Sequence, residues 1–90
     1  HKGTIENAYS ILNGEYEIIE AEIIETSELI NKELKNSNLP DEIRIGAVLR
    51  GEEVIIPRSN FIFKKEDIVV FLAKKDFLKV VENMFRLSSI

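Results

Sequence analysis

Hydrophobic residues in the second half of the chain gather in short runs, which glycine or clusters of charge separate. Two runs, residues 43–49 and 54–57, flank a polar turn at 50–53, and a third at 68–73 follows a charged stretch. Runs of β-branched residues with this punctuation are typical of neighbouring antiparallel strands. The third run is apolar on both faces, which predicts a strand in the centre of a sheet or at an interface.

An alternating pattern at residues 15–24 predicts the first strand. Successive side chains of a strand point to opposite faces of the sheet. One face of this strand carries Ile19, Ala21 and Ile23, and the other carries Ile18, Glu20, Glu22 and Ile24. The mixed face is expected to be solvated or to form half of an interface.

Helical spacing of apolar residues predicts three helices. A short one over residues 5–12 ends at Asn13-Gly14. A second is capped by Ser27 or Thr26 and ends before Pro40. The third covers residues 76–85, and its apolar face consists of Phe77, Val80, Val81, Met84 and Phe85.

These elements predict a single α+β domain. We expect a mainly antiparallel sheet of about four strands, with helices packed on one face and the other face left for a partner. Residues 1–14 are interpreted as a short helical lead-in, and residues 15–90 as the domain itself.

Composition argues against several classes of function. No apolar run reaches the roughly 20 residues that a membrane-spanning helix needs, and the absence of cysteine excludes disulfides and thiolate metal sites. The only histidine is His1, at the end of the chain, so the serines have no histidine that could activate them as nucleophiles. The carboxylates form no recognisable catalytic motif either. The sequence predicts a protein that is not an enzyme.

The net charge of −4 is unevenly distributed. Residues 1–42 contain ten acidic side chains against three lysines, whereas residues 43–90 contain nine basic side chains against six acidic ones. The net charge is negative, and no aromatic residues are interleaved with the basic ones. Both observations argue against a nucleic-acid surface. An acidic ribbon at Glu17, Glu20, Glu22, Glu25 and Glu28 is either a solvated face or a divalent-cation site.

The strand at 43–50 carries the candidate ligand-binding residues. Its two faces are formed by Ile43, Ile45, Ala47 and Leu49, and by Arg44, Gly46, Val48 and Arg50. Arginine binds phosphate through paired N–H donors, and glycine allows a ligand to approach the backbone. We therefore select Arg44, Gly46 and Arg50, with Arg58 nearby. In the alternative interpretation, these arginines form ion pairs with the acidic strand of the same copy or of a second one.

Apolar residues outside the expected core face are candidates for a dimer interface. They are Ile18, Ile24, Ile68 and Val70. The alternative to a ligand-sensing domain is a ligand-free dimerisation and assembly domain that uses these residues.

Five stretches of the sequence resemble the C-terminal domain of RCK (regulator of potassium conductance) proteins, the TrkA-C family. They are residues 20–22 (EAE), 45–47 (IGA), 57–58 (PR), 65–67 (KED) and 81–86 (VENMFR), and the resemblance covers residues 15–88. Within the family, the sequence is most similar to the regulatory subunits of bacterial Trk potassium uptake systems.

The resemblance implies a cytoplasmic regulatory domain, peripheral to the inner face of the membrane through a Trk-type potassium transporter subunit. It also implies a homodimer or higher homo-oligomer. In several relatives, cyclic di-AMP sits at the dimer interface, near the strand that matches 44–49 and the proline that matches Pro57. Pro57 therefore joins the candidate ligand-binding residues.

The resemblance further implies a nucleotide-binding domain N-terminal to this chain, from which residues 1–14 would lead. NAD is expected in that domain. The Gly-x-Gly-x-x-Gly phosphate loop that such binding requires is missing here, so no cofactor is expected in this chain.

Overall fold

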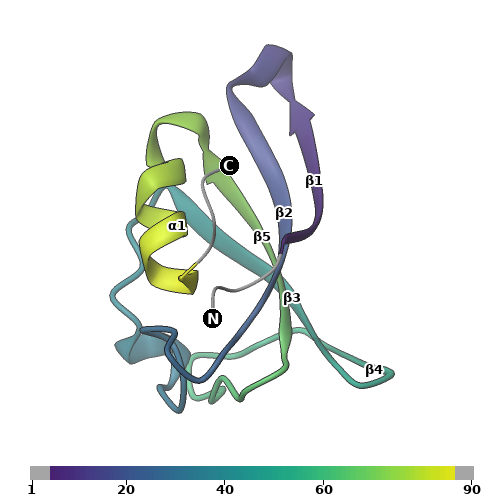
Figure 1. Ribbon diagram of the computed structural model, residues 1–90, viewed down its shortest axis with the longest axis vertical. Coiled ribbons are helices and arrows are strands. Elements are labelled where there is room, and N and C mark those ends of the chain that lie inside the picture. The colour runs from purple at the N-terminus through teal and green to yellow at the C-terminus, as the bar shows by residue number, and fades with distance from the viewer. Residues whose placement is uncertain (1–4, 87–90) are drawn as a thin grey trace.

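Five strands form one sheet, and one α-helix packs against it, in the part of the chain that the computed structural model describes, residues 5–86 (Figure 1). The strands are β1 (Ile5–Ile11), β2 (Tyr16–Glu22), β3 (Ile43–Arg50), β4 (Glu53–Ile55) and β5 (Ile68–Lys74), and the helix is α1 (Leu78–Phe85). Short 3₁₀ turns lie at Leu12–Gly14, Leu34–Asn36 and Lys75–Phe77. The predicted α+β class is confirmed.

The strand order is β1-β2-β5-β3-β4, and every pair is antiparallel. β5 therefore lies in the middle of the sheet, as its apolar residues on both faces predict. The side chains of β5 that point to the core are Val69, Phe71 and Ala73. Those of the opposite face are half-buried and comprise Ile68, Val70 and Leu72.

Residues 5–11 form strand β1, so the predicted helix over residues 5–12 is wrong. β1 pairs with β2 along almost its whole length. This pairing satisfies the backbone hydrogen-bonding groups, whereas two isolated helical turns are unstable in water. Asn13 and Gly14, with φ of +57° and +87°, belong to the tight turn between the two strands and do not end a helix. The sheet consequently has five strands instead of about four.

The predicted second helix is also wrong. Residues 25–31 form a series of turns, Glu33 forms an isolated β-bridge with Ile62, and the only helical piece between residues 25 and 40 is the 3₁₀ turn Leu34–Asn36. Asn31 has φ of +60°, a left-handed conformation that interrupts a helix, and its N–H donates to the carbonyl of Phe63 at 2.8 Å. The backbone of this segment thus pairs with the distant segment 59–63.

Ser27 fixes this loop to the C-terminal helix. Its Oγ accepts a hydrogen bond from the N–H of Leu29 at 3.2 Å, as a capping serine does. The same hydroxyl donates to the carbonyl of Met84 at 2.8 Å, and the N–H of Glu28 donates to that carbonyl at 3.1 Å. Ser27 thus makes the predicted capping hydrogen bond, but a turn follows it instead of a helix.

A β-bulge at Gly46 reverses the faces of β3. The register with β5 shifts between Ile45 and Ala47, and one extra residue moves every later side chain to the other face. Val48, predicted on the outward face, is fully buried, and Leu49 is half-buried on the opposite face. The predicted faces of this strand are therefore correct only up to Ile45.

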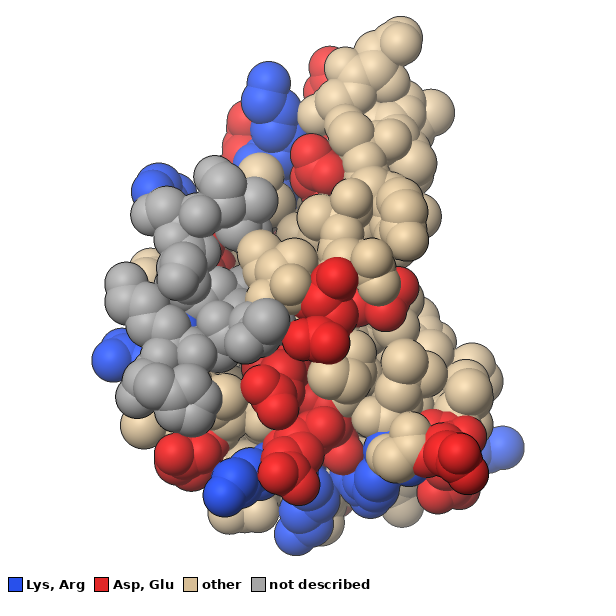
Figure 2. Space-filling view, turned by 45° about the vertical axis from the view of Figure 1, so that its right-hand side comes forward, with Lys and Arg blue, Asp and Glu red and all other residues tan. Residues whose placement is uncertain are grey.

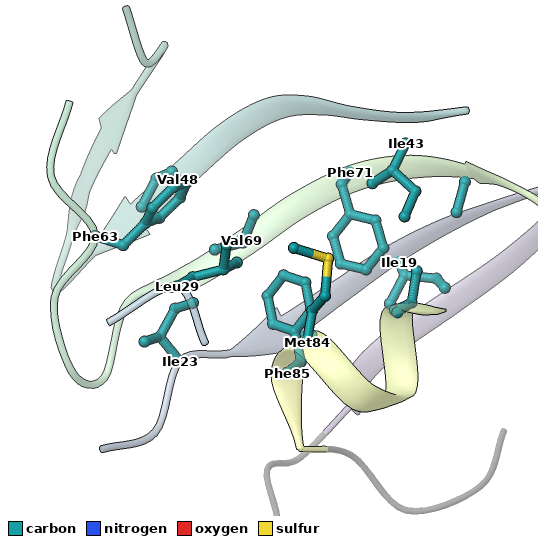
Figure 3. Packing of buried hydrophobic residues seen from close by; sticks show 13 residues of the cluster. Ile19, Ile23, Leu29, Ile43, Val48, Phe63, Val69, Phe71, Met84 and Phe85 are labelled. Carbon is teal, nitrogen blue, oxygen red and sulfur yellow. The ribbon is translucent and has the colours of Figure 1, made fainter. Parts of the chain in front are cut away.

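The core lies between the sheet and α1 (Figure 3). Phe71 of β5 and Phe85 of α1 stack with ring centroids 5.0 Å apart and planes 12° apart. Val81 and Met84 of the predicted helix face are buried as well, but Val80 is 36% exposed, so its assignment to that face is wrong. Because α1 and the buried loop residues lie on one side, no helix of residues 5–86 covers the other face of the sheet.

Replacing Glu66 by glycine is expected to stabilise the domain. Glu66 has φ of +75°, an exposed side chain and a backbone N–H bonded to the carbonyl of Ile23 at 2.8 Å. Glycine adopts this conformation without the cost of about 1–2 kcal/mol that other residues incur, although it also gains freedom in the unfolded chain. We expect a net gain of about 0.5–1 kcal/mol in the free energy of unfolding, measured by urea denaturation.

The matched control is Lys65→Gly, one residue earlier in the same turn. Lys65 is exposed and has no positive φ. Glycine there is expected to destabilise by about 0.5–1 kcal/mol. Equal effects of the two substitutions would contradict the assignment of backbone strain to Glu66.

Candidate functional site

The face of the sheet opposite α1, which we call the outer face, is formed by side chains that alternate with those of the core. Strand pairing places most of them in three rows, and Tyr16 and Lys74 lie opposite each other beyond the first row. The first row is Tyr9, Ile18, Leu72 and Arg44, the second is Asn7, Glu20, Val70 and Ala47, and the third is Glu22, Ile68, Leu49 and Val54. Apolar residues of β5 occupy the middle of each row, so the outer face is apolar at its centre.

The charged residues of the outer face are divided between its two flanks. Glu20 and Glu22 lie on β2, on one side of β5, and Arg44 lies on β3, on the other side. Val54, on the edge strand β4, is 66% exposed. The outer face therefore combines an apolar centre with an acidic flank and a basic flank.

Three of the four predicted interface residues lie together on this face. Ile18, Ile68 and Val70 belong to neighbouring rows and are half-buried. Ile24 is elsewhere, because the chain leaves the sheet after Glu22, and its side chain is only 3% exposed. The prediction for Ile24 assumed that the strand continues to residue 24, but β2 ends at Glu22.

A cavity of about 540 Å³ opens at one end of the outer face. Its walls are formed by Ile11, Leu12, Tyr16, Asp41, Glu42, Arg44, Leu72 and Lys74. The guanidinium of Arg44 lies 4.0 Å from the carboxylate of Asp41, and the two side chains are 72% and 93% exposed. Such an exposed pair contributes little to stability and leaves both groups accessible.

Sequence reasoning missed Tyr16 and Lys74, which lie opposite each other on β2 and β5. The alternation of side chains along a strand would have identified them. Tyr16 is two residues from Ile18, and Lys74 is two residues from Leu72, so each shares the outer face with an apolar residue already assigned to it.

Arg50 has a different role from Arg44, because it is held inside the domain. Its Nε and Nη2 donate to the two carboxylate oxygens of Asp67, each at 2.8 Å, and Nη2 also donates to the carbonyl of Ile62 at 3.0 Å. The guanidinium lies 4.9 Å from the centroid of the Phe61 ring. This bidentate pair attaches the segment 57–67 to the end of β3.

The carboxylate of Asp67 is the buried partner, with its residue only 1% exposed, and it also accepts the N–H of Lys64 at 2.8 Å. Hydrogen bonding to Asp67 raises the pKa of Arg50 above its usual value, while burial opposes this shift. The guanidinium of Arg50 therefore stays charged, and its charge faces the buried carboxylate of Asp67.

The structure divides the predicted ligand-binding residues between the two ends of β3. Arg44 lies at the cavity, and Arg50 is six residues further along the strand, roughly 20 Å away at the usual rise per residue. Pro57 and Arg58 follow β4, which pairs with β3 at residues 48–50, and neither lines the cavity at Arg44. Gly46, in the bulge between them, is exposed, and a Cβ atom there would meet only the carbonyl oxygen of Val70, at 3.6 Å.

Acidic side chains gather in a band down the middle of the view in Figure 2, and mostly uncharged surface lies to its upper right. Within residues 5–86, no group of three or more acidic or histidine side chains is arranged to hold a metal ion. None of the helices described is long and apolar enough to cross a membrane.

Comparison with known proteins gives consistent results. The family described as the TrkA-C domain matches residues 18–86. The chain is 40% identical over 97% of its length to the Trk system potassium uptake protein TrkA of Azorhizobium caulinodans. It is 36% identical over 71% of its length to a TrkA homologue of Archaeoglobus fulgidus, and 34% identical over 98% to TrkA of Haemophilus influenzae.

The chain spans only 19%, 15% and 20% of the lengths of these three relatives, so the likeness concerns one domain of a longer protein. The family match nevertheless runs from Ile18 in β2 to the end of α1, so it includes the outer face except its β1 residues and Tyr16. On this evidence, the chain belongs to the TrkA-C domain family.

Proposed function

We propose that this chain is a cytoplasmic regulatory domain of a bacterial potassium uptake system, and that two copies associate through their outer faces. The observation that carries the proposal is the apolar centre of the outer face, which α1 leaves uncovered. The names of the relatives, potassium uptake proteins, support the assignment of the system. The domain would act at the inner face of the membrane by gating a separate potassium-translocating subunit.

The dimensions of the outer face suit a stable pair. Four strands of seven or eight residues and the three-residue β4, about 4.8 Å apart, cover about 500 Å² per copy. Two such faces reach the total of about 1,000 Å² that specific interfaces require. If the pair adopts two packings, a partner that prefers one of them shifts the equilibrium between them, which is how the domain would regulate.

The substitution Val70→Asp tests the association. Val70 lies on the middle strand and in the middle row of the outer face, so a carboxylate there would be buried between the two copies without a partner. We expect the wild-type chain to be dimeric at micromolar concentration and the variant to be monomeric, by light scattering, with circular dichroism confirming that it folds.

The matched control is Val80→Asp, the same change at an exposed position of α1, which should leave the dimer intact. A wild-type chain that stays monomeric at about 100 μM, well above the dissociation constants of ordinary stable complexes, would refute the association. So would a Val70→Asp variant that dimerises as well as the wild type.

A small-molecule site in the cavity at Arg44 is a second candidate function. A volume of about 540 Å³ lies in the range of ligand pockets. Arg44 and Lys74 supply cationic groups for phosphate, while Tyr16, Ile11 and Leu72 supply apolar surface for a base. We therefore propose a nucleotide, with cyclic di-AMP as the first probe. We assign no cofactor to this chain and propose NAD only for an N-terminal domain outside it.

Thermal denaturation with cyclic di-AMP, ATP or NADH tests this candidate. A ligand at 100 times its dissociation constant adds about 2.7 kcal/mol, which raises the Tm of a domain this size by roughly 10–20 °C. Arg44→Ala should abolish the shift, and the exposed Arg58→Ala should preserve it. An unchanged shift in Arg44→Ala would place the ligand elsewhere, and no shift with any probe would leave assembly as the only function proposed.

A further inference from the structure

We infer that the two copies pack with a twofold axis parallel to β5, so that Glu20 of each copy forms an ion pair with Arg44 of the other. This arrangement rests on the proposed association through the outer face. It specifies which strands meet and which side chains recognise the second copy.

The symmetry of the strand order permits this packing. β5 has two strands on each side, and sheets that pack face to face keep their strands within about 30° of one another. A twofold axis between such sheets runs either along the strands or across them. An axis along β5 places β2 over β3 of the second copy and β1 over its β4. An axis across β5 places each strand over the same strand of the second copy.

The charges of the outer face distinguish the two arrangements. With an axis that crosses β5 at Val70, in the row of Glu20, Glu20 lies over Glu20 of the second copy, and like charges that face each other are destabilising. With the axis along β5, each row faces the same row in reverse. Glu20 then lies over Ala47 of the second copy, one row away from its Arg44, within the reach of two long side chains.

The surface opposite Glu20 has room for its carboxylate. Ala47 is small, and Gly46 beside it carries no side chain and is exposed in the bulge. The fold itself does not require glycine there. Its φ is not in the left-handed range, and an added Cβ atom would make only an ordinary contact with the carbonyl of Val70. The missing side chain at Gly46 therefore leaves space for the Glu20 carboxylate of the second copy.

Both members of the inferred pair are weakly engaged within one chain. Arg44 lies 4.0 Å from Asp41 with both side chains exposed, and Glu20 accepts one long hydrogen bond from Asn7, at 3.4 Å. Neither contact would compete strongly with an ion pair inside the interface, where water is partly excluded. The acidic and basic flanks thus become complementary only when a second copy is turned about β5.

Charge reversal tests the arrangement. Arg44→Glu and Glu20→Arg, each alone, should weaken the dimer about tenfold or more, because two repulsive pairs replace two attractive ones. An equimolar mixture of the two single variants should form heterodimers, since every pair in the mixed dimer is again opposite in charge. The double variant should dimerise within about threefold of the wild type, with dissociation constants from analytical ultracentrifugation. Glu22→Arg, a control on the same strand that lies over Leu49, should have a smaller effect.

Glu20→Gln separates the two axes, because it weakens the dimer if Glu20 faces Arg44 and strengthens it if Glu20 faces its own copy. Single variants that dimerise as well as the wild type, or a mixture that does not associate, would overturn the inference and leave the proposed association standing. A monomeric wild-type chain would overturn both.

Discussion

Replacing Arg50 by alanine is expected to lower the free energy of unfolding by about 3–5 kcal/mol, the usual consequence of removing one partner from a buried ion pair. The large value follows from the burial of Asp67, which is 1% exposed. Without Arg50, its carboxylate keeps only the N–H of Lys64 as a hydrogen-bond donor among the contacts described for residues 5–86. A buried negative charge would then remain uncompensated, and the segment 57–67 would lose its attachment to β3.

The reciprocal substitution, Asp67→Ala, is expected to cost less, about 2–3 kcal/mol. The side chain of Arg50 is 39% exposed, so it can turn toward water once its partner is removed. The unequal effects of the two substitutions therefore report the unequal burial of the two charges.

Chemical denaturation of both single variants and of the double replacement Arg50→Met with Asp67→Leu measures these effects. The apolar pair should recover much of the loss, because no buried charge is left behind. Arg58→Ala is the control, an exposed arginine whose removal should change stability by less than about 0.5 kcal/mol. An Arg50→Ala variant within that same margin would show that the pair does not hold the segment.

The role of Arg50 illustrates which features the sequence could predict. Alternation within one strand identified the inward residues of β2 and the central position of β5, because both depend only on local periodicity. The pair between Arg50 and Asp67 joins residues 17 positions apart, through a loop whose path no periodic pattern describes. Arg44 and Arg50 look equivalent in the sequence, and only the partners of each side chain distinguish a surface arginine from a structural one.

The wrong predictions have two physical causes. Residues 5–12 satisfy a helical spacing, but the hairpin turn at Asn13-Gly14 brings them to an open strand edge, and tertiary pairing outweighs a weak local preference. The prediction of the two faces of β3 is wrong for another reason. A single extra residue at Gly46 reverses the alternation, and a glycine within a strand pattern signals that a bulge is present without locating the shift in register.

Removing the ring of Phe85 is expected to destabilise the domain about as much as removing Arg50, by about 3–5 kcal/mol, the usual cost of replacing a buried phenylalanine by alanine. Phe85 is fully buried and stacks on Phe71 of the central strand. Its helix, α1, has eight residues, fewer than an isolated helix needs to persist in water. α1 therefore depends on its packing against the sheet, and Phe85 contributes the largest side chain of that contact.

The expected result for Phe85→Ala is a fall in Tm of roughly 15–30 °C, since each kcal/mol corresponds to about 4–8 °C in a domain of this size. Hydrogen exchange at the amides of α1 should accelerate more than at β5, because the sheet keeps its ladder while the helix loses its contact. Val80→Ala, on the exposed side of the same helix, should change little. A Phe85→Ala variant that loses less than about 1 kcal/mol, well below the cost of a core cavity, would mean that α1 does not close the core of this domain.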